Sequence, residues 1–182
     1  MKLKEGNKAL NFRVEDIYGN EIQLSDYKGK KIILSFMRNV SCPFCNFRVH
    51  ELIGNSLRLQ SAEVQVVVLF ESAAEKLKGS VFHKGLAPFP LIGDPEKKVY
   101  NLYGIENSAI KMMKTFFSGS AYKTLKASKK EGVPRLEDKE SSNTLIPADF
   151  FIDENFKIVK AHYGNNLNDH VSMDEVREFA GW

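Results

Sequence analysis

Residues 32–48 read IILSFMRNVSCPFCNFR, and this stretch joins an apolar run to a segment that carries the only two cysteines of the chain, Cys42 and Cys45. The run at 32–37 is short and rich in branched and aromatic residues, which is typical of a strand buried on both faces of a sheet. Pro43 suits the first turn of a helix, where its missing N–H group would have no partner. The sequence therefore predicts that the cysteines lie where a central strand ends and a helix begins.

Outward from this junction, strand-length apolar runs alternate with stretches of helical period. VQVVVLF at 64–70 predicts a second buried strand. The segment between the two strands predicts a helix with a broad apolar surface, formed by Phe44, Phe47, Leu52, Leu57 and Leu59. Strand, helix and strand in this order form a right-handed crossover. The predicted fold class is therefore α/β, with a mostly parallel sheet.

The second half of the chain continues the alternation. PLIGDP at 90–95 predicts a short strand and a turn before a helix that runs through Leu102. ADFFID at 148–153 and KIVKAHY at 157–163 predict a hairpin.

Both ends of the chain carry local signals. The stretch at 12–27 predicts an edge hairpin that turns at Gly19–Asn20. Near the C-terminus, Ser172 is followed three residues later by Glu175, which is the spacing of a capping box and predicts a closing helix.

Residues 108–143 depart from this pattern. A single helix over 108–127 would place five apolar side chains on one face, those of Ile110, Met113, Phe117, Ala121 and Leu125. The polar stretch at 129–143 has no periodicity, and its apolar residues are few beyond Val133 and Leu136. Charge runs usually form solvated loops, so we expect an inserted covering helix and a flexible loop. The alternative is that 129–143 forms a flap over a site.

Composition bounds the remaining possibilities. A chain of 182 residues with 43% hydrophobic and 27% charged residues fits one globular domain over 1–182. Twenty-six basic against 23 acidic residues give a net charge of +3, which indicates neither a nucleic-acid nor a membrane partner. The N-terminus lacks the apolar region of a secretory signal, and no apolar run approaches the length of a membrane span. We therefore expect a soluble cytoplasmic protein.

The cysteine pair indicates redox chemistry. At a helix start, Cys42 lies beside unpaired N–H groups and the positive end of the helix dipole, which stabilise a thiolate. Cys42 is therefore the expected nucleophile, and Cys45, one turn deeper, is placed to attack a product formed on Cys42. Arg48 and Arg38 could each add positive potential, or each could be an ordinary surface cation.

A metal site finds less support. The four histidines, at 50, 83, 162 and 170, form no second close pair of ligands at zinc-finger spacing. We expect His50 on the solvent side of its helix and Asp169–His170 in a polar turn. No metal is predicted.

The sequence resembles the peroxiredoxin-like group of thioredoxin-fold proteins, the alkyl hydroperoxide reductase and thiol-specific antioxidant family. Four stretches carry the resemblance: residues 4–36, RNVSCPFCNFRVHEL, DPEKKVYNLYGI and IPADFFIDENFKIVKAHYG. It implies a thioredoxin-like fold with a central mixed sheet flanked by helices, an N-terminal hairpin extension and an insertion before the strand that follows Pro147.

The resemblance also assigns site positions, with departures. Asn39 stands where typical peroxiredoxins have Thr or Ser, and Pro147 stands where they have an arginine. Pro147 instead resembles the cis-proline of thioredoxins, which faces the Cys-x-x-Cys motif, so the Ile146–Pro147 bond is expected to be cis. The buried acid of thioredoxin would fall at Phe36, which leaves Glu71 as a candidate proton acceptor for Cys45, the alternative being a solvated carboxylate.

The expected function is a thiol-dependent oxidoreductase in which Cys42 attacks a protein disulfide or a hydroperoxide and Cys45 resolves the product to a disulfide. The resemblance implies a thioredoxin- or glutathione-type reductant and a possible homodimer. No glycine-rich phosphate loop is present, so no bound cofactor is expected and NADPH would act through a partner reductase. The alternative is a redox-sensing binding module without sustained turnover.

Overall fold

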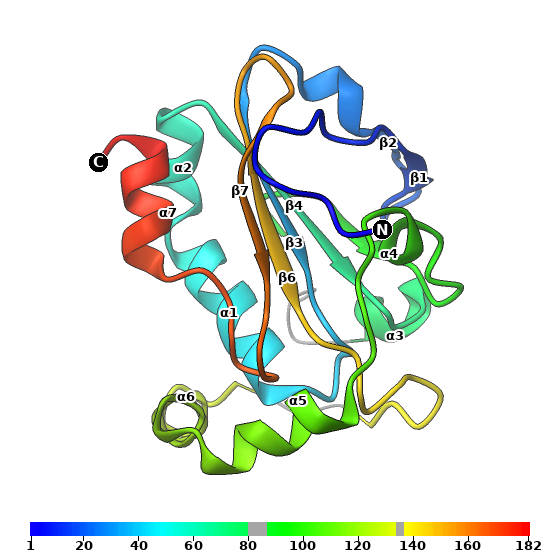
Figure 1. Ribbon diagram of the computed structural model, residues 1–182, viewed down its shortest axis with the longest axis vertical. Helices are drawn as coiled ribbons and strands as arrows, with labels where there is room; N and C mark the ends of the chain where they lie inside the picture. The colour runs from blue at the N-terminus through cyan, green and yellow to red at the C-terminus, as the bar shows by residue number, and fades with distance from the viewer. Residues whose placement is uncertain (80–86, 134–136) are drawn as a thin grey trace.

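The structure is a computed structural model that describes residues 1–79, 87–133 and 137–182. A five-stranded sheet forms its centre, in the order β5-β4-β3-β6-β7 (Figure 1). The strands are β3 (Lys31–Phe36), β4 (Val64–Phe70), β5 (Leu91–Gly93), β6 (Ala148–Ile152) and β7 (Ile158–Tyr163). β3 pairs parallel with β4 and antiparallel with β6, so the sheet is mixed. The predicted α/β class, both central strands and the 148–163 hairpin are confirmed. The prediction of a mostly parallel sheet is wrong, because β4 and β5 pair parallel but β6 and β7 pair antiparallel.

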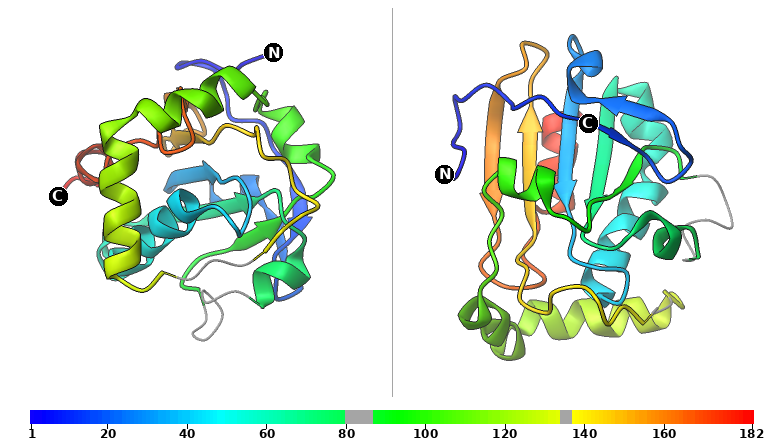
Figure 2. Two further views of the ribbon diagram at one scale, coloured as in Figure 1. Left: turned by 90° about the horizontal axis from the view of Figure 1, so that it is seen from below. Right: turned by 90° about the vertical axis from the view of Figure 1, so that its right-hand side faces the viewer.

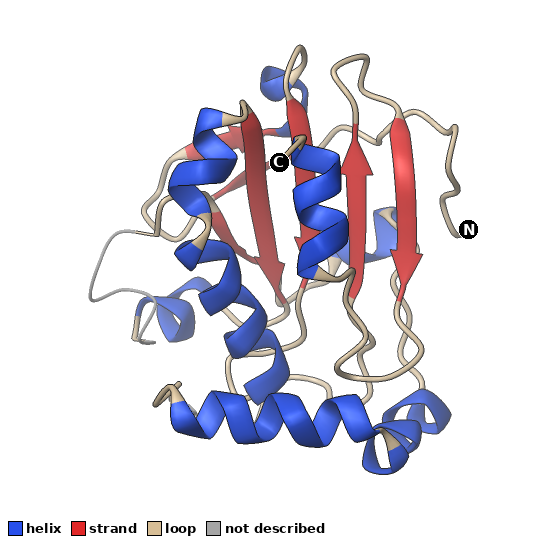
Figure 3. Ribbon diagram, turned by 90° about the vertical axis from the view of Figure 1, so that its left-hand side faces the viewer, coloured by secondary structure: helices blue, strands red, loops and turns tan. Residues whose placement is uncertain are grey.

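Helices cover both faces of the sheet. On one face lie α1 (Pro43–Gly54), α2 (Ser56–Ser61) and α7 (Met173–Ala180), as Figure 3 shows. The opposite face is covered by the N-terminal segment and α4 (Lys98–Leu102), while the short helix α3 (Ala74–Lys78) follows β4 (Figure 1). Side chains alternate along β3, so that Ile33 enters the core under α1 and Ile32 enters the core under α4. This arrangement buries β3 on both sides, as the sequence predicts.

Tyr100 fixes the end of β3 at which the cysteine motif begins. Its buried hydroxyl lies 2.6 Å from the carbonyl oxygen of Met37 and 3.0 Å from that of Leu69, and so is in reach of two neighbouring strand ends. Its ring packs edge-on against Phe36 at 5.1 Å between ring centroids. The loop that leads into α1 therefore leaves from a rigid point of the sheet.

The predicted helix between β3 and β4 is two helices. α1 ends at Gly54, and Asn55 caps it before α2 begins at Ser56. This break turns Leu57 into solvent, so the prediction that Leu57 belongs to the apolar surface is wrong. Further along α2, the guanidinium of Arg58 lies 5.6 Å from the ring centre of Trp182, which joins α2 to the end of the chain.

The predicted elements at both ends of the chain are present. β1 (Arg13–Glu15) and β2 (Glu21–Gln23) form a separate two-stranded sheet, followed by the 3-10 turn η1 (Leu24–Tyr27). At the other end, the Ser172 hydroxyl accepts a hydrogen bond from the Glu175 N–H group at 3.2 Å, and the Ser172 N–H group donates to the Glu175 carboxylate at 2.8 Å. The predicted capping box is therefore confirmed.

The insertion differs from its prediction. It consists of α5 (Ala109–Lys114), the 3-10 turn η3 (Thr115–Phe117) and α6 (Gly119–Lys130). These elements cross the base of the molecule, at the end of the sheet to which β3 points (Figures 2 and 3). The single helix predicted over 108–127 is wrong, because Ser118 is extended and caps a new helix. That residues 1–182 form one domain with an insertion at 108–143 stays a prediction.

Candidate active site

The two cysteines lie side by side at the start of α1. Cys42 is the N-cap residue and Cys45 lies in the first turn, with 3.0 Å between their sulfur atoms. Both thiols are free, and their exposed fractions are 2% for Cys42 and 0% for Cys45. The pair is therefore reduced, in mutual contact and almost sealed from solvent.

Cys42 has the character of a thiolate. Burial opposes its ionisation, but the hydrogen bond from the Cys45 thiol and the positive charge of Arg38 outweigh burial and lower the pKa of Cys42 to about 6. A thiol with this pKa is ionised at neutral pH, and the thiolate is the nucleophilic form of cysteine.

Cys45 has the opposite character. Burial, together with the hydrogen bond to Cys42 and the charge of Cys42, raises the pKa of Cys45 well above its usual value. The Arg38 N–H group lies 3.3 Å from the Cys45 sulfur. The arrangement thus contains one thiolate and one thiol that keeps its proton.

Arg38 and Asn39 tie this junction to the end of the insertion. Arg38 donates from Nη2 to the carbonyl oxygen of Asn143 at 2.7 Å, and Asn39 donates from Nδ2 to that of Ser142 at 3.3 Å. The Asn39 carbonyl oxygen also accepts a hydrogen bond from the Cys42 N–H group at 3.0 Å. Sequence reasoning treated Arg38 and Arg48 alike, but only Arg38 contributes to the pKa shifts of the thiols.

The segment 137–143 is anchored by a residue that sequence reasoning missed. The buried carboxylate of Asp138 accepts hydrogen bonds from Ser72 and, at 2.7 Å, from the ammonium group of Lys76. Nearby, the Ser142 N–H group donates to Glu71 at 2.8 Å. An aspartate within a charge run gives no local signal of burial. The segment therefore reaches the edge of the thiol site as predicted, while its mobility stays a prediction and Leu136 lies outside the described residues.

Pro147 is buried at the start of β6, and its carbonyl oxygen accepts a hydrogen bond from the Gly164 N–H group at 2.9 Å. Among the described residues no peptide bond is cis, so the prediction of a cis Ile146–Pro147 bond is wrong. The ordinary trans form carries the chain straight into the strand. Ile146 belongs to the same buried cluster as Cys42 and Cys45.

Arg48 is neither beside the thiols nor on the surface. Its exposed fraction is 3%, and its Nη1 donates to the sulfur of Met173 at 2.8 Å, while its carboxylate neighbour Glu51 lies 3.8 Å away. Next to it, Asp149 accepts hydrogen bonds from Ser35 at 2.7 Å and from Nδ1 of His170 at 3.0 Å. Arg48 acts on Asp149 through its charge, while its buried Nε and Nη2 have no hydrogen-bond partner in the described ranges. We call this group under α1 the Asp149 network: Ser35, Arg48, Asp149 and His170.

Other ionisable candidates take structural positions. The backbone N–H groups of Asp169 and His170 donate to the carbonyl oxygens of Asn166 and Asn168, so the expected polar turn is present, while the His170 side chain joins the Asp149 network. His50 is exposed, as expected, and pairs with Glu131 at 2.9 Å. Glu71 is buried and forms an ion pair with Lys97 at 2.6 Å, so it is not a solvated carboxylate. Across the ranges that the structure describes, no group of three or more His, Cys, Asp or Glu side chains could hold a metal ion.

The sequence profile described as the AhpC/TSA family matches residues 6–161, so the chain belongs to this family. A relative from Mycobacterium tuberculosis (strain ATCC 25618 / H37Rv), named "Putative peroxiredoxin Rv2521", is 28% identical over 171 residues, which cover 94% of this chain and 92% of the relative. Thiol-disulfide oxidoreductase ResA of Bacillus subtilis (strain 168) is 29% identical over 104 residues, or 57% of each chain.

A solved structure supports the fold. The crystal structure of peroxidoxin BcpB from Mycobacterium tuberculosis superposes with a TM-score of 0.69 at 13% identity, covering 98% of this chain and 97% of that one. The thioredoxin-like fold that the sequence resemblance implies is thereby confirmed. Among the described residues, none of the helices combines the length and hydropathy that a membrane crossing requires.

Proposed function

We propose that this member of the AhpC/TSA family, a thiol-dependent oxidoreductase, reduces hydroperoxides with Cys42 as the attacking thiolate and Cys45 as the resolving thiol. One observation carries the proposal, namely the contrast between the two sulfurs. Cys42 has its pKa lowered to about 6, while Cys45, 3.0 Å away, has its pKa raised. One sulfur is thus prepared to attack and the other to supply a proton and form the second bond.

The reaction takes two steps on the protein. In the first, the Cys42 thiolate attacks an oxygen of the hydroperoxide, the O–O bond breaks, and Cys42 becomes a sulfenic acid while an alcohol leaves after protonation. In the second, the Cys45 sulfur attacks the sulfur of the sulfenic acid, water leaves and the Cys42–Cys45 disulfide forms. The two electrons that the peroxide gained come from the two thiols, so the disulfide is their oxidised form. A dithiol reductant returns two electrons and two protons, becomes a disulfide itself and restores both thiols.

Burial favours a small substrate over a protein disulfide. With 2% of its surface exposed, Cys42 can be reached by a small hydroperoxide far more readily than by a folded substrate chain. Arg38 supplies the guanidinium that typical family members take from a distant strand, because its charge already stabilises the Cys42 thiolate. Asn39 and Pro43 support the site by shaping the loop and the first helical turn that hold Cys42.

A protein disulfide is the second candidate substrate, and the similarity to ResA favours it. The same two cysteines would then form a mixed disulfide on Cys42, which Cys45 resolves. A redox-sensing module without sustained turnover is the non-enzymatic alternative. Repeated turnover with a reductant separates an enzyme from a sensor, because a sensor would be oxidised once and stop.

The proposal includes a thioredoxin- or glutathione-type reductant and a cytoplasmic location, where such reductants keep thiols reduced. A homodimer stays a prediction, and light scattering after size-exclusion chromatography tests it.

The decisive experiment is rapid-quench oxidation of the reduced protein by hydrogen peroxide, an organic hydroperoxide and a model disulfide in parallel. Trapped species are identified by mass spectrometry. We expect both peroxides to react at least about tenfold faster than the model disulfide, with the Cys42–Cys45 disulfide as product. A faster reaction with the disulfide would assign the second candidate instead, and no reaction with any of the three would reject both.

A further inference from the structure

The insertion exposes large apolar side chains that are normally buried. Phe116 and Phe117 expose 80% and 88% of their surfaces, and they lie in the turn η3 between α5 and α6. Three further large apolar side chains of the insertion are exposed, those of Ile110, Met113 and Tyr122. Contiguous exposed apolar side chains on a soluble domain indicate an interaction surface.

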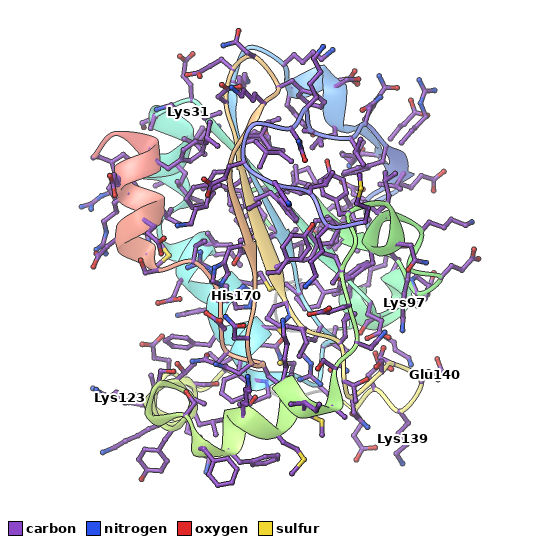
Figure 4. The ribbon with its side chains drawn as sticks, viewed as in Figure 1. Lys31, Lys97, Lys123, Lys139, Glu140 and His170 are labelled. Carbon is purple, nitrogen blue, oxygen red and sulfur yellow. The ribbon has the colours of Figure 1, made fainter. Side chains whose placement is uncertain are left out.

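Charge is concentrated in the same segment. Residues 108–130 contain six lysines and no acidic residue, so the remainder of the chain has 20 basic and 23 acidic residues. Lys111 forms an ion pair with Glu106 at 2.7 Å. The other five lysines of the segment form no ion pair with any residue in the described ranges, and Lys123 projects outward from the end of α6 in Figure 4.

The shape of the segment is that of a base plate. α5 and α6 meet at an angle and lie in one layer across the end of the molecule, as the view from below in Figure 2 shows. Their inner sides pack on the domain through Thr115, Ala121 and Ser128, which are buried. The exposed aromatic side chains and the lysines without an ion pair therefore lie in one layer, whose buried side chains face the domain.

We propose that the α5–η3–α6 segment, which we call the base, binds the surface of an anionic phospholipid bilayer. Helices with lysines and exposed phenylalanines that lie in one plane suit the interface of a membrane, where apolar side chains enter the acyl boundary and lysines contact anionic headgroups. A second copy of the chain suits the base less well, because the five lysines without an ion pair in one copy would lie near the same five in the other. The net charge of +3 gave no sign of this surface in the sequence. It sums a strongly positive segment, 108–130, and a remainder that has more acidic than basic residues.

The base also adjoins the thiol site. Ala121 of α6 packs in the buried cluster that contains Cys42 and Cys45, and Met112 and Leu125 pack against the same cluster. Binding through the base would therefore bring the thiol pair to the membrane surface. The hydroperoxides available there are those of peroxidised acyl chains. This consequence rests on the proposed function, whereas the binding itself does not.

The test is co-sedimentation of the full chain with vesicles of phosphatidylcholine alone and of equal parts phosphatidylcholine and phosphatidylglycerol. We expect binding to the anionic vesicles that salt weakens, and little binding to the neutral ones. The Phe116→Ser/Phe117→Ser variant should bind at least about tenfold more weakly, because each ring loses its burial in lipid. Lys123→Gln/Lys126→Gln should lose about 25-fold, at about fivefold per lysine.

Matched controls come from the other end of the molecule. Leu57→Ser removes an exposed apolar side chain from α2, and Lys4→Gln/Lys30→Gln removes two exposed charges, so both should bind like the unaltered chain. Circular dichroism confirms that each variant is folded.

Three outcomes would overturn the proposal. The first is equal or absent sedimentation with the two vesicle types. The second is a doubled mass in light scattering that Phe116→Ser/Phe117→Ser abolishes, which would assign the base to a second copy. The third is that the chain binds polyglutamate as tightly as it binds anionic vesicles, and that the phenylalanine variant loses no affinity. This result would assign the base to an acidic protein partner. None of these readouts requires peroxidase activity.

Discussion

Helix α1 and the base invert the usual placement of residues. On α1, Arg48 exposes 3% of its surface and its charge acts on the buried Asp149, whereas on the base Phe117 exposes 88%. The negative charge of Asp149 partly compensates the buried positive charge of Arg48 inside the domain. The exposed rings of the base have no such compensation within the described structure. A charged residue can therefore be buried when an opposite charge lies near it. A large apolar residue that stays exposed indicates a partner outside the domain.

The largest effect should come from the thiols themselves. Cys42→Ser should abolish turnover, because the only ionised sulfur is lost. Cys45→Ser should still react once and accumulate a sulfenic acid or mixed disulfide on Cys42, which mass spectrometry detects. Faster oxidation or alkylation of Cys45 than of Cys42 in the unaltered protein would reverse these roles.

The Asp149 network should show the next largest effect, on stability. Burial opposes the charge of Asp149, but His170, Arg48 and Ser35 hold the pKa of Asp149 well below its usual range. Asp149→Asn should lower the free energy of unfolding by about 3 kcal/mol in urea titrations at neutral pH, since it removes the negative charge that acts on the buried Arg48 guanidinium. Asp174→Asn, which removes an exposed carboxylate, should change it by less than about 1 kcal/mol.

The difference in the free energy of unfolding between the unaltered chain and Asp149→Asn should depend on pH. Because folding depresses the pKa of Asp149, its stabilisation is complete above about pH 4, the value of an unfolded aspartate, and is lost as pH falls below that point. The stability gap between the unaltered chain and Asp149→Asn should therefore narrow from about pH 4 downward. A gap that stays constant over this range would show that the charge of Asp149 is not its source.

Arg38 should have a moderate effect on rate. The rate of peroxide oxidation should rise with pH around a midpoint near pH 6, the pKa of Cys42. Arg38→Gln removes the nearby positive charge and should raise that midpoint by about one unit, which lowers the rate at the original midpoint about fivefold. Arg38→Lys keeps a charge and should restore most of the shift. An unchanged midpoint in Arg38→Gln would show that Arg38 does not stabilise the Cys42 thiolate.

The segment from Lys129 to Asn143 should have a smaller and selective effect. Replacing it with a short Gly/Ser linker should leave the fold intact and change the rate with bulky organic hydroperoxides more than with hydrogen peroxide. Asp138→Asn is the gentler version, because it weakens the contacts to Ser72 and Lys76. Each hydrogen bond contributes about 0.5–1.5 kcal/mol, or about two- to tenfold in opening of the segment. Identical kinetics for every substrate would mean that the segment does not control access to the thiols.

Substitutions in the base should have the smallest effect on stability. They test directly whether its exposed rings differ from the buried Asp149 network. Phe116→Ser/Phe117→Ser should change the free energy of unfolding by less than about 0.5 kcal/mol, because exposed side chains lose few contacts. A loss comparable to that of Asp149→Asn would mean that the rings pack within the domain. Urea titrations of both variants side by side decide the point.

Local patterns were sufficient for the sheet and for the thiols. β3 and β4 are continuous apolar runs bounded by polar residues, and a strand buried on both faces needs nothing else to be recognised. The capping box at Ser172 and the Cys-x-x-Cys at the start of α1 are likewise contained within a few residues.

Contacts between distant segments decided the positions that local patterns missed. Arg48 and His170 are 122 positions apart, yet both lower the pKa of Asp149, and the hydrogen bond to Asp149 holds the His170 side chain inside. Asp138 is buried because Ser72 and Lys76 lie beside it. The residues near Asp138 in the sequence do not indicate these distant partners. The 108–127 segment has an apolar helical period, but its cap at Ser118 redirects the chain. Ala121 and Leu125 still pack against the domain, whereas Ile110, Met113 and Phe117 are left outside.

The place of the single tryptophan governs what optical methods can detect. Trp182 ends the chain and stacks with Arg58 of α2, which in Figure 1 stands at the opposite end of the molecule from the start of α1, where the thiols lie. Its fluorescence emission will therefore respond to the α2–α7 corner and hardly to oxidation of Cys42. A flat emission trace after mixing with peroxide would not mean an inert protein, and a tryptophan introduced at Phe47 would give the thiol site a fluorophore of its own.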